Sequence, residues 1–214
     1  LRRGMKVLAI NGSTRKDGCT YLALLETAKA LDAEGIETEI VQMGSDPVRD
    51  CIGCNGCAGK GQCVFGDDMV NEIIARAEGA DGFIFGSPVY YAHPSGQLLS
   101  MLDRLFYAGG SAFSHKPGAA VVTARRAGTT ASLDVLNKYM TDAQMPIVSS
   151  TYWNMVFGPV PELVEQDKEG LQTMRNLGRN MAWLLKCIQT GQQSGIEVPF
   201  AETANWTNFN RTVK

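Results

Sequence analysis

The stretch "MKVLAINGSTRKDGCTYLALLETAKALDAEG", residues 5–35, changes its hydrophobic pattern part-way along. Residues 5–10 are mostly apolar, which is typical of a strand buried on both faces. Residues 19–35 carry leucines at helical spacing and end in Gly35, a residue type that commonly follows the end of a helix. A strand, a polar loop and a helix in this order predict the first βα unit of an α/β protein.

The same alternation repeats along the rest of the chain. Further strands are predicted at 36–43, 81–89, 118–124 and 146–153, and further helices at 67–80, 95–107, 129–143 and 168–191. Asp67 is the predicted N-cap of the helix at 67–80, and Cys187 is predicted to face the core from the last helix. Because parallel strands need crossover connections, the pattern predicts a doubly wound, five-stranded parallel sheet with helices on both faces.

The organisation of the chain predicts one domain. No repeat, low-complexity tract or linker interrupts residues 5–194, and the cysteine-rich segment 50–66 is predicted to be an irregular loop within that domain. Residues 195–214 lack clear periodicity. They are predicted to form a C-terminal tail, which is either an arm packed on a partner subunit or a loosely held end.

Composition and charge disfavour several classes of protein. Among the 214 residues, 44% are hydrophobic and 20% are charged, as in ordinary globular domains, and the formal net charge is −2. Without a basic field, neither nucleic acid nor an anionic membrane is an expected partner. The apolar runs are too short to span a bilayer and residues 1–4 show no apolar signal segment, so a reducing, cytoplasmic location is expected.

Three loops follow predicted strands, at the edge of the sheet where doubly wound proteins bind ligands. The first, "NGSTRKDGCT" (11–20), combines glycines, hydroxyl side chains and the start of a helix. Backbone N–H groups and the helix dipole favour an anion there, and Arg15 and Lys16 add positive charge. The loop predicts phosphate binding, and a polar surface turn is the alternative. It matches neither G-x-x-x-x-G-K-[ST] nor G-x-G-x-x-G, which disfavours a P-loop ATPase or an ordinary NAD-binding domain.

The second and third loops carry aromatic and basic side chains. In "GSPVYYAHPSGQL" (86–98), prolines stiffen a segment whose adjacent tyrosines can lie against a planar ring or pack as ordinary apolar residues. His93 in this loop is expected to be a surface residue rather than a catalyst. In "TARRAGTT" (123–130), small residues permit close approach of the backbone to a ligand. Its two arginines can meet a phosphate, the edge of a reduced ring or only solvent.

Together these loops resemble those of the flavodoxin-like NAD(P)H-dependent FMN reductase family, from about Lys6 to Leu185. "NGSTRKDGCT" is similar to that family's phosphate loop, G-S-x-R-x-x-G-x-T, and "GSPVYYAHPSGQLLSMLDR" (86–104) is similar to its isoalloxazine loop and the helix after it. The resemblance implies a flavodoxin-like fold and an FMN site. Ser13, Arg15, Gly18, Cys19 and Thr20 would hold the phosphate, Pro88, Val89, Tyr90 and Tyr91 would line the flavin, and Ala124, Arg125, Arg126 and Gly128 would close its far edge. Cys19 departs from the asparagine of many relatives, but its backbone N–H can still serve.

The stretch "CIGCNGCAGKGQC" (51–63) holds four of the six cysteines of the chain. In a reducing compartment, cysteines this close together favour metal or redox chemistry over structural disulfides. From the residues alone, zinc, a disulfide and free redox thiols remain alternatives to a cluster. Within the FMN reductase family, an iron–sulfur flavoprotein subgroup carries C-x2-C-x2-C-x5-C between the second strand and the next helix, and this chain matches that spacing and place. The resemblance implies a [4Fe–4S] cluster on Cys51, Cys54, Cys57 and Cys63.

The family resemblance implies an enzyme in which FMN accepts hydride from NAD(P)H and passes electrons to a quinone, nitro compound, free flavin or another small acceptor. No side chain is expected to act as a catalytic acid or base. The alternative is an electron carrier that serves ferredoxin-like partners and has no nicotinamide site. Relatives form dimers or tetramers, so a homodimer or homotetramer is expected, with Trp153, Met155, Phe157 and Trp206 as candidate interface residues.

Overall fold

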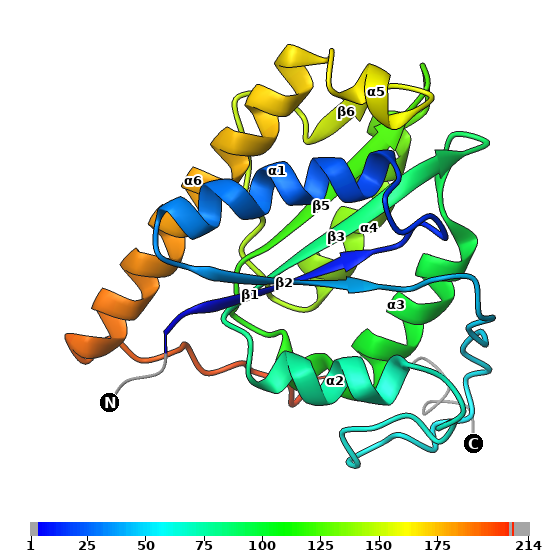
Figure 1. The fold of residues 1–214 in the computed structure, drawn as a ribbon. Coiled ribbons are helices and arrows are strands. Elements are labelled where there is room, and N and C mark those ends of the chain that lie inside the picture. Colours follow the sequence, from blue (N-terminus) through cyan, green and yellow to red (C-terminus); the bar gives the residue numbers. More distant parts are fainter. Residues whose placement is uncertain (1–3, 206, 208–214) are drawn as a thin grey trace.

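Five parallel strands form the sheet, in the order β2-β1-β3-β5-β6 (Figure 1). The computed structural model describes residues 4–205 and residue 207. After β2 the chain crosses back over β1 to reach β3, which is the strand order of flavodoxin-like proteins and puts the topological switch point between β1 and β3. The predicted doubly wound parallel sheet is confirmed. The strands are β1 (Lys6–Asn11), β2 (Glu37–Gln42), β3 (Gly82–Tyr90), β5 (Gly118–Ala124) and β6 (Met155–Phe157), and the two-residue β4 (His93–Pro94) pairs antiparallel with the end of β3.

Helices cover both faces of the sheet, with α1 and α6 on one face and α2, α3 and α4 on the other (Figure 1). Alternate side chains of β1 supply the two cores. Val7 and Ala9 pack under α1 and α6, whereas Leu8 and Ile10 pack under α2, α3 and α4. Burial on both faces is the reason that residues 7–10 of this strand are all apolar. The helices are α1 (Cys19–Ala33), α2 (Val70–Glu78), α3 (Gly96–Gly109), α4 (Thr129–Asp142), α5 (Pro161–Val164) and α6 (Lys168–Gln193), with a 3-10 turn at Gly110–Ala112.

The prediction of a strand at 146–153 is wrong, because the last strand is β6 at Met155–Phe157. Ile147 forms only an isolated bridge with Gly118. The chain then leaves the sheet through 149–153, whose hydroxyl and aromatic side chains are mostly exposed. It rejoins β5 where Asn154 O accepts a hydrogen bond from Val122 N at 3.0 Å. The predicted strand is interrupted because the side chains of 149–153 lie mostly in solvent, so this segment does not pair with β5.

Two predictions about single residues are also wrong. α2 begins at Val70, and Asp68 rather than Asp67 accepts a hydrogen bond from its first N–H, from Val70 N to Asp68 Oδ1 at 3.1 Å. Cys187 is exposed on α6 instead of facing the core. Leu185 belongs to the buried side of α6, and a residue two positions further on lies roughly 200° around the helix, on the solvent side.

The segment after α6 has no regular structure in its described part, because residues 196–205 contain neither helix nor strand. The domain boundary at 194 and the interface role of 195–214 stay predictions, and Trp206 lies outside the described residues. Among the residues that the structure describes, no helix is both long and apolar enough to cross a membrane.

Candidate functional site

The loops that follow β1, β3 and β5 lie next to one another at the carboxyl edge of the sheet (Figure 1). Gly12 N donates to Gly86 O at 2.8 Å, which joins the first loop to β3. The buried hydroxyls of Thr20 and Thr123 lie 2.9 Å apart and join α1 to β5. The structure thus brings the three predicted loops together. Of the predicted residues, Ser13, Gly18, Thr20 and Ala124 are buried, Cys19, Pro88, Val89 and Gly128 are half-buried, and Arg15, Tyr90, Tyr91, Arg125 and Arg126 are exposed.

The first loop presents backbone N–H groups at the start of α1. The helix begins at Cys19 after Gly18, and no side chain caps it. The N–H groups of a first helical turn have no acceptor within the helix, so they point toward an anion placed beyond its start. Ser13 Oγ accepts from Arg15 N at 3.2 Å, and Asn11 Oδ1 accepts from Ser13 N at 3.2 Å. These bonds fix the turn that carries Arg15, and the arrangement fits a phosphate group.

Asn11 and Gln42 support this loop, and the sequence analysis missed both. Asn11 is fully buried at the end of β1, and its Nδ2 donates to Gln42 Oε1 at 2.6 Å. Gln42 Nε2 in turn donates to Ser13 O at 2.5 Å. Because an unpaired buried polar group costs roughly 1–3 kcal/mol, such a pair holds its geometry firmly. The signal that could have revealed it is the pairing of β1 with β2, which aligns the two amides at the ends of neighbouring strands.

The Cys19 thiol is half-buried in the loop region and hydrogen-bonded to the backbone. Its Sγ donates to Gly158 O at 3.5 Å. Burial raises the pKa of the thiol above its ordinary value, outweighing a backbone hydrogen bond and the charge of Arg15, which both lower it. A neutral thiol adds no negative charge where a phosphate is predicted, so cysteine at this position is compatible with anion binding.

The second loop turns sharply at its tip. Tyr91 and Ala92 have positive φ values of 50° and 60° and connect β3 to β4. Tyr90 is 52% exposed and Tyr91 is fully exposed, so neither is a core residue. Their rings are free to lie against a planar ligand. His93 is also exposed, as expected.

Gly128 joins the second loop to the third. It is the N-cap of α4 and has a φ of 87°. A Cβ at this position would lie 2.4 Å from Ala92 Cα and 2.9 Å from Val89 Cγ1, closer than any side chain allows. Glycine is therefore required here for two reasons, its backbone conformation and its contact with the neighbouring loop. Arg125 and Arg126, just before it, are exposed and available to a ligand at this edge.

Arg15→Ala is expected to weaken FMN binding by about 1.5–3 kcal/mol, the range for hydrogen bonds to a charged group. Riboflavin, which lacks the phosphate, should bind nearly as well as before. Quenching of flavin fluorescence measures both affinities. Arg179→Ala on α6 is the matched control, because it removes an exposed arginine from another part of the surface and should change neither affinity. Equal losses of FMN and riboflavin binding in Arg15→Ala would contradict the phosphate assignment.

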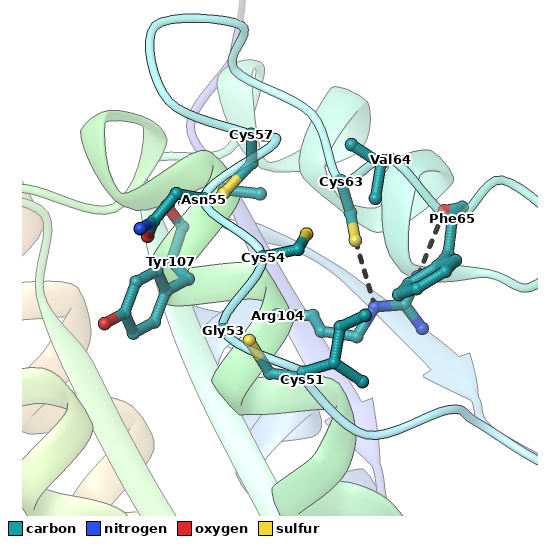
Figure 2. A pocket seen from close by; sticks show the side chains of 12 residues that line it. Cys51, Gly53, Cys54, Asn55, Cys57, Cys63, Val64, Phe65, Arg104 and Tyr107 are labelled. Carbon is teal, nitrogen blue, oxygen red and sulfur yellow. Dashed lines mark hydrogen bonds between the residues drawn. The ribbon is translucent and has the colours of Figure 1, made fainter.

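The four cysteines of segment 51–63 line one pocket (Figure 2). Positive φ values of 62° at Gly53 and 54° at Asn55 turn the loop tightly between the first cysteines. Cys63 approaches from the returning part of the loop, so both arms contribute thiols. The rest of the lining comes from this loop and from α3, and includes Ile52, Val64, Phe65, Arg104, Tyr107 and Ala108.

Arg104 of α3 brings a buried positive charge to this pocket. It is 1% exposed, and its Nε donates to Cys63 Sγ at 3.2 Å, the bond drawn in Figure 2. Its Nη atoms pair with the carboxylate of Asp68 and donate to Phe65 O at 3.0 Å and Arg49 O at 3.2 Å. Burial alone would lower the pKa of Arg104, but the hydrogen bonds to Asp68 and Cys63 raise it, so the guanidinium stays charged. The sequence analysis missed Arg104. The feature that could have revealed it is an arginine on the apolar face of a predicted helix, where a charged side chain needs a buried partner.

The donor set fits an iron–sulfur cluster better than a single metal ion. In the described part of the chain, no three His, Cys, Asp or Glu side chains are placed to hold one ion. Zinc bonds its thiolates at about 2.3 Å and draws them close together. A cubane binds each thiolate through a different iron and keeps the sulfurs apart. Four cysteines around the edge of one mostly apolar pocket match the second arrangement.

α3 connects the two candidate sites. Its first residue, Gly96, lies in the last part of the second loop, whereas Arg104 lines the cysteine pocket. At 1.5 Å per residue, these two positions lie about 12 Å apart along the helix axis. The segment that leads to the cysteines is fastened to the same helix, since Gln97 Nε2 donates to Asp46 O at 2.5 Å. One helix therefore sets the position of the cysteine pocket relative to the loops.

A parallel sheet in this order, with three predicted ligand loops at its carboxyl edge, defines a flavodoxin-like α/β protein. Two solved structures share the fold. One is RosB with the bound intermediate 8-demethyl-8-formylriboflavin-5'-phosphate, at a TM-score of 0.65 and 14% identity, covering 96% of this chain and 93% of that chain. The other is a flavodoxin from the domain Archaea, at a TM-score of 0.58 and 13% identity, covering 85% of this chain and 99% of that chain.

The chain belongs to the NADPH-dependent FMN reductase family, whose model matches residues 5–159. A relative described as an iron–sulfur flavoprotein from Methanocaldococcus jannaschii is 35% identical over 193 residues, which cover 86% of this chain and 100% of that protein. The family resemblance predicted from the loops and the cysteine spacing is confirmed.

Proposed function

We propose that this protein is an iron–sulfur flavoprotein oxidoreductase that passes electrons from NAD(P)H to a small acceptor such as a quinone, a nitro compound or a free flavin. FMN would lie in the three loops at the carboxyl edge of the sheet, and a [4Fe–4S] cluster would be held by Cys51, Cys54, Cys57 and Cys63. Bound FMN supplies hydride acceptance and release of single electrons, and a bound cluster supplies storage of one electron.

The observation that carries the proposal is the placement of both candidate sites along α3. The loop predicted to line the flavin leads directly into this helix, and the four cysteines line a pocket against its later turns. The family match and the iron–sulfur relative support the same pair of cofactors. A cluster held by these four cysteines would lie near the predicted flavin loops and could exchange single electrons with a bound flavin.

The residues of this chain bind and orient the flavin rather than move protons. Arg15 and the first N–H groups of α1 would hold the phosphate, and Asn11 would keep their loop in place. Tyr90 and Tyr91 would cover the ring, and Gly128 would let the third loop approach it. Because the cofactor performs the redox chemistry, no acid or base among these side chains is required.

A second candidate function is an electron carrier that serves ferredoxin-like proteins without a nicotinamide site. It is favoured by the exposed apolar residues of the cysteine pocket: Ile52 is 64% exposed, Val64 48% and Tyr107 68%. Exposed apolar patches of this kind mark docking surfaces for other proteins. The two functions share both cofactors and differ in the electron donor.

Protein made and kept without oxygen is expected to contain one FMN and about four irons and four sulfides per chain, the composition of a [4Fe–4S] cluster on four cysteines. Its absorption spectrum should show flavin bands over a broad cluster absorption. Stopped-flow reduction with NADH, NADPH and reduced ferredoxin then separates the two functions. Rapid reduction by a nicotinamide supports the enzyme, and reduction by ferredoxin alone supports the carrier. Stoichiometric zinc in place of iron would overturn both.

We also propose a homodimer or homotetramer located in the cytoplasm. Trp153 and Phe157 are 58% and 37% exposed at the end of the sheet near β6 and are available for an interface. Met155, expected from the sequence to join them, is only 6% exposed and belongs to the core, because its side chain packs beneath the sheet.

A further inference from the structure

We propose that Arg104 is a positioning residue for Cys63 and that its hydrogen bond raises the reduction potential of the cluster. This inference rests on the proposed cluster. The structure joins the two residues directly, since Arg104 Nε donates to Cys63 Sγ at 3.2 Å. Hydrogen bonds to the sulfurs of a cluster are one of the means by which a protein sets its potential.

The guanidinium of Arg104 is fixed on every side. Both Nη atoms reach Asp68, one of them also donates to Phe65 O and the other to Arg49 O. Asp68 is itself fixed, because its Oδ1 accepts from the first N–H of α2. With the Nη atoms held in this way, the Nε–H can point in only one direction, toward the sulfur. The arginine therefore locks the cysteine at the end of the loop to α3.

The surroundings of this bond make it electrostatically strong. Arg104 is 1% exposed, and the side chain of its partner Asp68 is 8% exposed. The ring of Phe65 lies over the guanidinium, with its centroid 5.5 Å from Cζ. Away from water, an N–H from a charged group interacts more strongly with a thiolate than it would at the surface.

The expected direction of the effect follows from charge. Reduction adds one electron to the cluster and makes its sulfurs more negative, with no bond broken. A buried N–H donor from a cation stabilises that state more than the oxidised one. Removing the donor should therefore lower the reduction potential and make the cluster harder to reduce.

Arg49 offers a matched control for charge. Its Cζ lies 4.6 Å from the centroid of the same Phe65 ring, but the residue is exposed. In the part of the chain that the structure describes, its side chain donates no hydrogen bond to a cysteine sulfur. Arg49→Gln thus removes one positive charge from the same neighbourhood and leaves the bond to Cys63 in place.

The test is an anaerobic redox titration with dithionite, followed by the cluster's electron paramagnetic resonance signal and by the flavin absorbance. Arg104→Gln is expected to keep its iron and to shift the cluster's redox equilibrium at least tenfold toward the oxidised form, about 59 mV for a one-electron couple. Arg49→Gln should shift it less than threefold. The flavin potential should not change in either variant, because Arg104 contacts none of the flavin loops.

An unchanged cluster potential in iron-loaded Arg104→Gln, or an equal shift in Arg49→Gln, would overturn the role of Arg104 while leaving the cluster assignment intact. Iron-free parent protein would overturn the cluster assignment itself. If Arg104→Gln fails to retain iron, Arg104→Lys replaces it in the comparison, since lysine keeps the buried cation without the fixed Nε–H. It should retain iron and show a lowered potential, and a potential equal to that of the parent protein would overturn the proposal.

Discussion

Cys54→Ala is expected to give protein that contains FMN but almost no iron, against about four irons per chain in the parent protein. Cys54 is an exposed residue of the pocket, so its loss would leave one iron of the proposed cluster without a protein ligand and open to solvent. Flavin content should not change, because the three predicted flavin loops are formed by other segments of the chain. Iron, sulfide and flavin are measured on protein purified anaerobically.

The control is Cys187→Ala, which removes a cysteine that is exposed on α6 and lines no part of the pocket. It should keep both iron and flavin. Cys54→Ala should also slow electron transfer to external acceptors if the cluster relays electrons. Full iron retention in Cys54→Ala, or loss of flavin together with the iron, would rule out the four-cysteine cluster as a site separate from the flavin.

Much of the fold could be predicted because the local pattern and the tertiary environment agree. β1 and β5 are largely apolar since each is buried on both faces, and β5 occupies the predicted range 118–124. The last strand could not be placed, because Ile147 and Val148 carry a strand-like pattern yet make only the contact next to Gly118. The choice between that segment and 155–157 depends on which polar residues reach solvent, which a local pattern does not reveal.

The candidate site could be predicted where its residues are contiguous in sequence, as in "NGSTRKDGCT" and the cysteine segment. It could not be predicted where contacts join distant elements. Gln42 reaches Ser13 only because β2 pairs with β1, and Arg104 reaches Cys63 across 41 positions of sequence. Both are polar residues among apolar neighbours in the sequence, Val41 and Met43 beside Gln42, and Leu102 and Leu105 near Arg104. Buried polar groups require partners, so such positions are where a sequence points to an unseen contact.

Several hydrogen bonds hold the cysteine loop against α3, and the bond from Arg104 to Cys63 is one of them. Much of segment 51–63 is exposed and has no regular structure. Its return arm is fastened by Asn71, which accepts from Cys63 N at 2.8 Å and donates to Cys63 O at 3.0 Å. Cys63 is thus bound from α2 through its backbone and from α3 through its sulfur, which makes it the best-anchored of the four cysteines.

Gly128→Ala is expected to weaken FMN binding at least tenfold and to lower the free energy of unfolding. A left-handed backbone at a residue with a side chain costs about 1–2 kcal/mol. The added Cβ would also lie 2.4 Å from Ala92 Cα, and relieving such an overlap typically costs about 1–3 kcal/mol. Because the overlapping atom is the backbone Cα of Ala92 and not the end of a flexible side chain, the second and third loops must move apart. Both loops are predicted to contact the flavin, so FMN binding should weaken.

The matched control for this change is Gly96→Ala, at the start of α3, where the second loop passes into the helix and none of the predicted flavin contacts lies. A Cβ there meets nothing within 4 Å, and its φ is not in the left-handed region. It should leave FMN affinity unchanged and the fold as stable or slightly more so, since alanine is a better helix former than glycine. Fluorescence titration with FMN and thermal unfolding of the flavin-free proteins measure the two effects separately. If Gly128→Ala bound FMN like Gly96→Ala while unfolding earlier, the glycine would serve only the packing of the loops, and the third loop would lie outside the flavin site.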